Sequence, residues 1–218
     1  MNGPGNRGSR TPDLPYAGDC EFTEFLRQRA FTRHDGKSGP LSRQGCLNRA
    51  KNIKLLLLDV DGVLTNGAIT YTHNGDEIKS FHCRDGFGMT MLRKIGVEIG
   101  LITARQSEAV SRRAHDLKIT HLFQGTRHKL EVFNRLIHDL GLAPREVAFM
   151  GDDWLDLPVL SQVGLAATVA DAMPELTPFI HFLSKFPGGQ GAVRELCDLI
   201  IEAQGRRTEL FTEYLTRV

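Results

Sequence analysis

The sequence predicts an α/β fold with three layers, in which a Rossmann-like parallel sheet is covered by helices on both faces. Short, continuous apolar runs alternate with amphipathic segments along most of the chain, and this alternation is typical of parallel sheets. The runs lack the apolar and polar alternation of half-buried strands, which indicates that both faces of the sheet are covered. Several runs end at Asp or Thr, so polar side chains are expected at the ends of strands.

Length and composition limit the possible classes of protein. The chain has 218 residues, a formal net charge of +1 and four cysteines. This length suits one domain with a complete core, and the balanced charges argue against a nucleic-acid-binding surface. The cysteines show no Cys-x-x-Cys spacing, so we expect reduced thiols and no structural zinc site. No stretch reaches the ~20 apolar residues of a membrane span, and we expect a cytoplasmic protein.

The chain divides into three parts. Residues 1–50 are expected to be a partly disordered N-terminal extension, because residues 1–15 are rich in Gly, Pro, Asn and Arg. Within this extension, Asp19 can cap one short helix, and residues 41–50 are expected to form another. Residues 51–204 form the main domain, and residues 205–218 form a C-terminal tail.

The first strand of the main domain, residues 53–58, ends at two carboxylates. Asp59 and Asp61 follow four consecutive leucines, and on an extended backbone they can point to the same side and share a cation or a substrate. The carboxyl edge of an open α/β sheet is where ligands bind. A strand that simply stops at a solvated Asp turn is the other interpretation of this stretch.

A small β-hairpin flap is expected next. Residues 68–73 and 76–81 are strand-like and flank Asn74-Gly75, a dipeptide that favours a hairpin with a primed turn. Asp85 then caps a helix that carries Met89 and Leu92.

The remaining elements alternate between strands and helices. The expected strands cover residues 97–102, 121–123, 147–150, 165–169 and 180–183. The expected helices cover residues 107–116, 128–140 and 171–176, with a last helix that begins near residue 191.

Polar residues follow several of the expected strands. Because the carboxyl ends of parallel strands lie at the same edge of a sheet, these residues should lie close together. They are Asp59, Asp61, Thr103, Lys129, Asp152, Asp153 and Asp156. Clustered carboxylates repel one another unless a cation lies among them, and an all-oxygen set suits Mg²⁺. A lysine and a hydroxyl are groups that stabilise a transferring phosphoryl group.

This set resembles the haloacid dehalogenase (HAD) superfamily of phosphotransferases over about residues 53–204. Four motifs occur in the family's order, at residues 59–65, 101–103, 129 and 151–156. The resemblance implies a HAD-like fold, an Mg²⁺ cofactor and an aspartyl-phosphate intermediate.

The same resemblance implies roles for individual residues. Asp59 would be the nucleophile and Asp61 the general acid and base. The metal ligands would be the carboxylates of Asp59 and Asp152 and the backbone carbonyl of Asp61. Thr103 would bind a phosphoryl oxygen, and Lys129 would neutralise charge. Two further carboxylates would orient Lys129 or metal-bound water, namely Asp153 and Asp156.

A closer resemblance is to the 3-deoxy-D-manno-octulosonate 8-phosphate phosphatase family. It is carried by stretches outside the catalytic motifs, at residues 61–67, 75–81, 84–88, 104–107 and 187–195. It implies an enzyme that dephosphorylates a sugar acid on the way to lipopolysaccharide. Asn66 stands where the family often has Asp, a mild change, and the first fifty residues match nothing in the family.

Two arginines are candidates for binding the substrate carboxylate. Arg84 and Arg105 flank strand-end loops, and Arg binds carboxylates bidentately. Each could instead be a plain surface ion-pair residue. Three other cations are expected to be solvated surface charges, namely Lys79, Arg93 and Lys94.

No segment is long enough for a cap domain over the site. We therefore expect a homotetramer in which the flap packs against its symmetry mates. The glycine-rich segment 188–191 would reach a neighbouring subunit's site as a lid, with Gly188 and Gly189 near the substrate.

Two alternatives stay open at this point. One is a phosphatase for a nine-carbon, sialic-type sugar acid 9-phosphate. The other is a catalytically silent HAD-like regulatory subunit, although clustered carboxylates that cost stability argue against a silent role.

Overall fold

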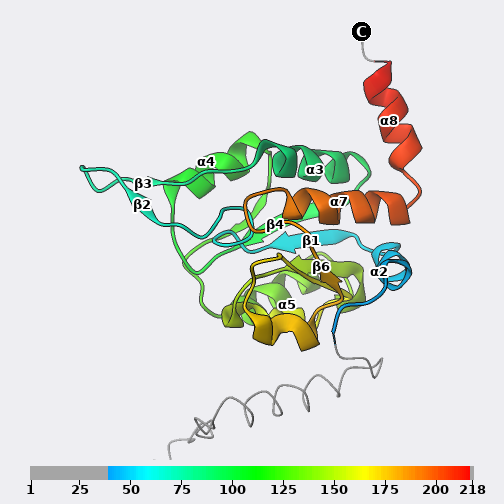
Figure 1. The fold of residues 1–218 in the computed structure, drawn as a ribbon, viewed down its shortest axis with the longest axis horizontal. Helices are drawn as coiled ribbons and strands as arrows, with labels where there is room; N and C mark the ends of the chain where they lie inside the picture. The colour runs from blue at the N-terminus through cyan, green and yellow to red at the C-terminus, as the bar shows by residue number, and fades with distance from the viewer. Residues whose placement is uncertain (1–38, 217–218) are drawn as a thin grey trace, which may run out of the picture.

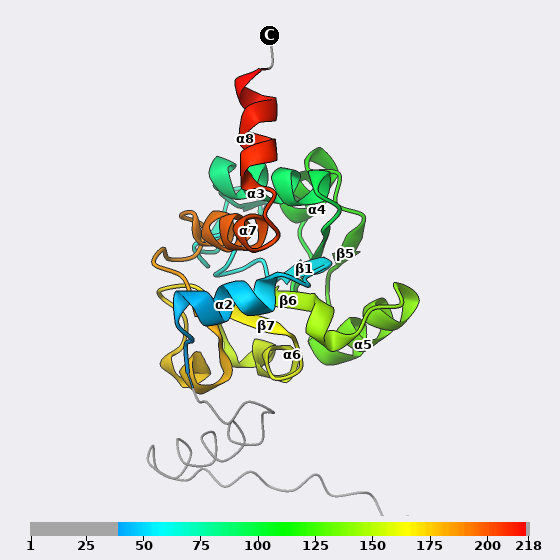
Figure 2. The same ribbon diagram turned by 90° about the vertical axis from the view of Figure 1, so that its right-hand side faces the viewer.

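The computed structural model describes residues 39–216 and confirms the predicted α/β architecture. The parallel sheet has the strand order β5-β4-β1-β6-β7-β8, with α3, α4 and α7 on one face and α5 and α6 on the other (Figures 1 and 2). Its strands are Leu55–Leu58 (β1), Glu98–Ile102 (β4), His121–Phe123 (β5), Val147–Met150 (β6), Leu165–Thr168 (β7) and Phe182–Leu183 (β8). The α-helices are Arg43–Ala50 (α2), Cys83–Lys94 (α3), Glu108–Asp116 (α4), Lys129–Asp139 (α5), Leu157–Leu160 (α6), Ala192–Ala203 (α7) and Arg207–Leu215 (α8).

Strand β1 lies in the middle of the sheet and aligns the strand ends beside it. It pairs in parallel with β4 and β6, so that Leu58 lies opposite Leu101 and Met150. The residues that follow these strands therefore meet at one edge.

The four leucines of β1 are fully buried and serve two cores. Leu56 and Leu58 belong to the core under α2, α3, α4 and α7, whereas Leu55 and Leu57 belong to the core under α5 and α6. Successive side chains of a strand point to opposite faces, so a sheet covered on both faces needs an unbroken apolar run. Each buried leucine contributes ~1.5–3 kcal/mol of transfer free energy.

Asp85 does not cap its own helix as predicted. Helix α3 begins two residues earlier, after His82, and Asp85 is buried inside its first turn. The Asp85 carboxylate instead accepts a hydrogen bond from the backbone N–H of Arg194, 2.7 Å away, in the first turn of α7. Asp85 thus caps a helix that is distant in the sequence, and it locks α3 against α7.

The β2–β3 hairpin is shorter than the apolar runs indicated. Thr70–Tyr71 (β2) pairs antiparallel with Glu77–Ile78 (β3). The predicted primed turn is wrong, because only Gly75 has a positive φ, of 89°. The backbone N–H of Gly75 donates to the carbonyl of Thr72, and that of Thr72 donates to the carbonyl of Asp76. This pattern describes a three-residue loop with a glycine bulge.

The remaining helices partly confirm and partly correct the predictions. The helix expected at 171–176 is a 3₁₀ helix, Pro174–Phe179 (η3), which begins at a proline because proline suits the first helical position. Helix α8 was not predicted; it buries Leu210 and projects from the body (Figure 1). Helix α2 confirms the helix expected at 41–50 and packs against α7 and β7. The helix that Asp19 was expected to cap lies outside the described residues.

No cap domain is inserted between β1 and β4 or between α5 and β6. Between β1 and β4 the chain forms only the hairpin and α3, and between α5 and β6 it forms only the 3₁₀ turn Pro144–Glu146 (η1). None of the described helices has the length and apolar content of a bilayer span.

Candidate active site

Three of the predicted carboxylates converge at the carboxyl edge of the sheet. Asp59 follows β1, Asp152 follows β6, and Asp156 ends the 3₁₀ helix Trp154–Asp156 (η2). One carboxylate oxygen from each lies within 4.8 Å of the others. Asp59 is only 7% exposed and Asp156 is fully buried. The convergence follows from strand order, since β1 and β6 are neighbours.

Lys129 lies between two of these carboxylates. As the first residue of α5 it is 3% exposed, and its Nζ is 2.7 Å from an oxygen of Asp59 and 2.7 Å from an oxygen of Asp156. Burial opposes the charge on Lys129, but the two carboxylates outweigh burial and raise its pKa. One ammonium group therefore offsets part of the negative charge of the cluster.

Asp156 and Asp153 differ in their contacts. The second oxygen of Asp156 accepts a hydrogen bond from the backbone N–H of Asp152 at 2.9 Å, so both of its oxygens are engaged. Asp153 caps η2 by accepting from the N–H of Trp154. No ion pair joins Asp153 to Lys129 within the described chain, so of the two carboxylates expected to orient Lys129 or metal-bound water, Asp156 is the one that contacts Lys129.

The cluster has the electrostatics of a cation site. Burial, with Asp156 close by, raises the pKa of Asp59 to about 6 despite Lys129. Burial and the charge of Asp59 raise the pKa of Asp152 to about 8. In addition, Oδ1 of Asp152 is buried without a hydrogen-bond partner. An oxygen-only set of this kind fits Mg²⁺.

Asp61 is not among the described carboxylates that could hold a metal ion together, so the structure gives no support to a cation shared by the side chains of Asp59 and Asp61. Oδ1 of Asp61 forms an ion pair with Lys79, and its Oδ2 is 4.0 Å from Nε of Arg105. Lys79 is not the solvated surface charge that was predicted, because its side chain is only 1% exposed. Its burial depends on how the hairpin folds back, which local sequence does not reveal.

Thr103 and the two arginines occupy different surroundings. Thr103 follows β4, is buried, and accepts a hydrogen bond through Oγ1 from the backbone N–H of Arg105 at 3.2 Å. Arg105 donates to Glu77 at 3.1 Å and to the hydroxyl of Tyr71 at 3.2 Å. Arg84 is exposed on α3, and no residue in 39–216 forms an ion pair with it.

The glycine-rich segment packs on the loop after β1 of its own chain. A Cβ on Gly188 would lie 1.9 Å from the carbonyl oxygen of Gly62, and one on Gly189 would lie 2.7 Å from the backbone of Thr65. The N–H of Gly189 also donates to the carbonyl of Val63 at 2.9 Å. Close backbone approach within one chain therefore explains these two glycines without a lid that crosses subunits.

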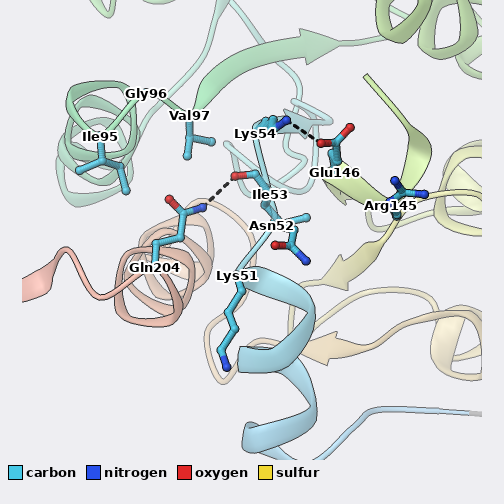
Figure 3. A pocket seen from close by; sticks show the side chains of 10 residues that line it. All are labelled: Lys51, Asn52, Ile53, Lys54, Ile95, Gly96, Val97, Arg145, Glu146 and Gln204. Carbon is cyan, nitrogen blue, oxygen red and sulfur yellow. Dashed lines mark hydrogen bonds and ion pairs between the residues drawn. The ribbon is translucent and has the colours of Figure 1, made fainter. Parts of the chain in front are cut away.

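A cavity of about 620 Å³ lies elsewhere in the molecule. It is formed at the amino ends of β1, β4 and β6, and its lining includes Lys54, Glu146 and Gln204 (Figure 3). Lys54 pairs with Glu146 at 2.7 Å, and Gln204 donates to the carbonyl of Ile53 at 2.8 Å. The acidic cluster lies at the opposite strand ends, so this cavity is separate from the candidate site.

The fold and the acidic edge define a hydrolase of the HAD superfamily. No protein-family model matches the sequence. A HAD superfamily (subfamily III A) hydrolase structure from Legionella pneumophila, described as putative, superposes with a TM-score of 0.76 at 41% identity, covering 80% of this chain and 96% of that one.

Relatives with named activities refine this class. The chain is 46% identical over 171 residues to 3-deoxy-D-manno-octulosonate 8-phosphate phosphatase KdsC of Escherichia coli K12, covering 78% of this chain and 90% of the relative. The same phosphatase from Moraxella catarrhalis, in complex with magnesium, phosphate and KDO, superposes with a TM-score of 0.76 at 36% identity, covering 78% and 97%. The chain belongs to the 3-deoxy-D-manno-octulosonate 8-phosphate phosphatase family, whose members are phosphoric monoester hydrolases.

Mg²⁺ should stabilise the protein more at about pH 8.5 than at about pH 5.5. The pKa values of Asp59 and Asp152 are raised in the fold, so the metal-free fold loses stability as the pH rises through about 6 and about 8. Bound Mg²⁺ requires ionised carboxylates and relieves their repulsion. Thermal unfolding with saturating MgCl₂ should show a rise in Tm of several degrees at the higher pH.

Two variants make this measurement specific. Asp152→Asn should lose most of the shift, whereas Asp116→Asn, at the exposed end of α4, should retain it. An equal shift at both pH values, or one that persists in Asp152→Asn, would contradict a metal site at this cluster.

Proposed function

We propose that the protein is an Mg²⁺-dependent phosphatase that hydrolyses 3-deoxy-D-manno-octulosonate 8-phosphate through an aspartyl-phosphate, as a step towards lipopolysaccharide. The placement of Asp59 carries this proposal. Its carboxylate lies at the end of the central strand, beside the ammonium of Lys129 and within 4.8 Å of two further carboxylates. Family membership supplies the substrate, since the relatives carry that activity in their names.

The residues of the site would divide the reaction between them. An oxygen of Asp59 attacks phosphorus while the bond from phosphorus to the sugar oxygen breaks, and Asp61 donates a proton to that oxygen. Asp61 then takes a proton from the water that attacks the aspartyl-phosphate, which releases phosphate and frees Asp59. Lys129 and the Thr103 hydroxyl stabilise charge on the phosphoryl oxygens.

The metal fits beside these groups. The carboxylates of Asp59 and Asp152 and the backbone carbonyl of Asp61 would hold Mg²⁺, which would withdraw charge from the phosphoryl group. Asp156 orients Lys129 rather than binding metal, because Lys129 and the Asp152 amide engage its two oxygens.

Asp59→Asn should reduce kcat by at least ~10³-fold, because an amide cannot form the covalent intermediate. Phosphate release from 3-deoxy-D-manno-octulosonate 8-phosphate with Mg²⁺ measures this loss, and circular dichroism shows whether the fold persists. Asp116→Asn is the matched control and should keep full activity. Near-wild-type turnover by purified Asp59→Asn would refute the nucleophile.

A panel of sugar phosphates tests the substrate. We expect the eight-carbon acid to give the highest kcat/KM. Preference for a nine-carbon, sialic-type acid 9-phosphate would favour the first alternative, and no turnover of any phosphate with Mg²⁺ would favour the silent subunit. The comparisons do not favour either alternative.

Arg105 and Arg84 are proposed to bind the substrate carboxylate. Replacing either residue by Ala should raise KM for the sugar acid phosphate several-fold, with little change in kcat/KM for a phosphate ester that lacks a carboxylate. Arg93→Ala, an exposed arginine that donates to the carbonyl of Leu117, is the control and should change neither value. Equal losses on both substrates would indicate a structural role instead.

Assembly is proposed to cover the open site. The hairpin exposes Ile69 (48%), Tyr71 (59%) and Ile78 (50%), and exposed apolar side chains of this size favour association. We expect a homotetramer by light scattering, and Ile78→Ser should weaken it. An active monomer at assay concentration would refute this proposal.

Cys46, Cys83 and Cys197 are free thiols, which agrees with a cytoplasmic compartment.

A further inference from the structure

Lys79 is a buried charge on an otherwise exposed hairpin. It follows β3 directly, and its side chain is 1% exposed although neighbouring hairpin residues are open to solvent. Burying an ammonium group without partners is strongly unfavourable, because the charge loses its hydration. The carboxylates that Lys79 contacts must therefore compensate for the burial of its charge.

Those carboxylates form a closed ring of alternating charge with two cations. Lys79 pairs with Oδ1 of Asp61 and lies 3.2 Å from Oε1 of Glu77. The same Glu77 oxygen is 3.1 Å from Arg105, and Nε of Arg105 is 4.0 Å from Oδ2 of Asp61. Two acids and two bases thus balance one another without any contribution from the metal-binding cluster.

Two lysines therefore divide the acidic edge into two groups. Lys129 contacts Asp59 and Asp156, and Lys79 contacts Asp61. Asp59 and Asp61 are two residues apart, yet among the described residues Asp61 is outside the set that could hold a metal ion. The lysine on the hairpin contacts Asp61 outside that set.

We propose that Lys79 is a positioning residue for the reaction: it holds the Asp61 carboxylate apart from the metal-binding carboxylates, where Asp61 can exchange a proton with the sugar oxygen. The inference rests on the proposed function, in which Asp61 is the acid and base. Lys79 keeps its own protons throughout. Asp61 gives one proton to the leaving oxygen and recovers one from water, so the cycle is balanced.

Two substrates separate positioning of an acid from a role on the phosphoryl group or in the fold. A sugar alkoxide leaves poorly without a proton, whereas nitrophenolate leaves without one. kcat/KM reports transfer of the phosphoryl group to Asp59, the step in which the two leaving groups differ. For Lys79→Met, kcat/KM should fall ~100-fold with the sugar acid phosphate but only about two- to three-fold with p-nitrophenyl phosphate.

Further variants control for a loss of activity that is caused by unfolding. Lys79→Arg restores the charge and should recover part of the sugar phosphate activity. The double variant Lys79→Met with Glu77→Gln removes both charges of the Lys79–Glu77 pair and should repeat the selective loss if the single variant fails to fold. Lys54→Met removes a lysine paired with Glu146 at the opposite edge and should change neither substrate's kcat/KM.

The outcomes discriminate between explanations. Equal losses on both substrates would show that Lys79 acts on the phosphoryl group or on the fold. No loss on either substrate would show that Asp61 does not depend on Lys79 for its position. Either result overturns the inference. If the wild-type protein hydrolyses neither substrate with Mg²⁺, the proposed function fails and this inference fails with it. Calorimetric Mg²⁺ binding by Lys79→Met should stay unchanged, because Lys79 contacts none of the clustered carboxylates.

Discussion

The rest of the site is arranged around the repulsion among three carboxylates at the carboxyl edge of the sheet. Asp59, Asp152 and Asp156 are close enough to share a cation, and burial makes their charges harder to sustain. Burial and the neighbouring carboxylates accordingly raise the pKa values of Asp59 and Asp152. A fold that only had to be stable would place apolar residues here, so the cluster is understandable as a site that is complete when a cation is bound.

The scaffold contributes rigid backbone to this edge. Four buried leucines hold β1 between two cores, and the loop after β1 is held from outside by the glycine-rich segment before α7. Gly188 comes so close to the Gly62 carbonyl that no side chain fits between them. Asp85 ties the start of α7 to α3. The loop that carries Asp61 is thus fixed by contacts from a segment more than a hundred residues away.

Sequence reasoning succeeded where local pattern decides structure. The strands were predicted to within about two residues because buried parallel strands are continuous apolar runs, and the strand ends identified Asp59, Asp152 and Lys129 because parallel strands share one carboxyl edge. Reasoning failed where tertiary packing decides. Asp85 looks like the cap of its own helix until α7 is seen beside it, and Lys79 looks like a surface charge until the hairpin is folded over Asp61.

Environment, rather than residue type, separates the chemistry of two aspartates that are two positions apart. Asp59 lies with Lys129 and other carboxylates in a buried group, which suits attack on phosphorus beside a metal. Asp61 lies in a ring of ion pairs with Lys79, Glu77 and Arg105, apart from the described carboxylates that could hold a metal ion, and this position suits the proton exchange proposed for it. Catalytic carboxylates with different tasks are commonly distinguished by such surroundings. Here the surroundings of Asp61 are supplied largely by the hairpin, through Lys79 and Glu77, so the hairpin is part of the site.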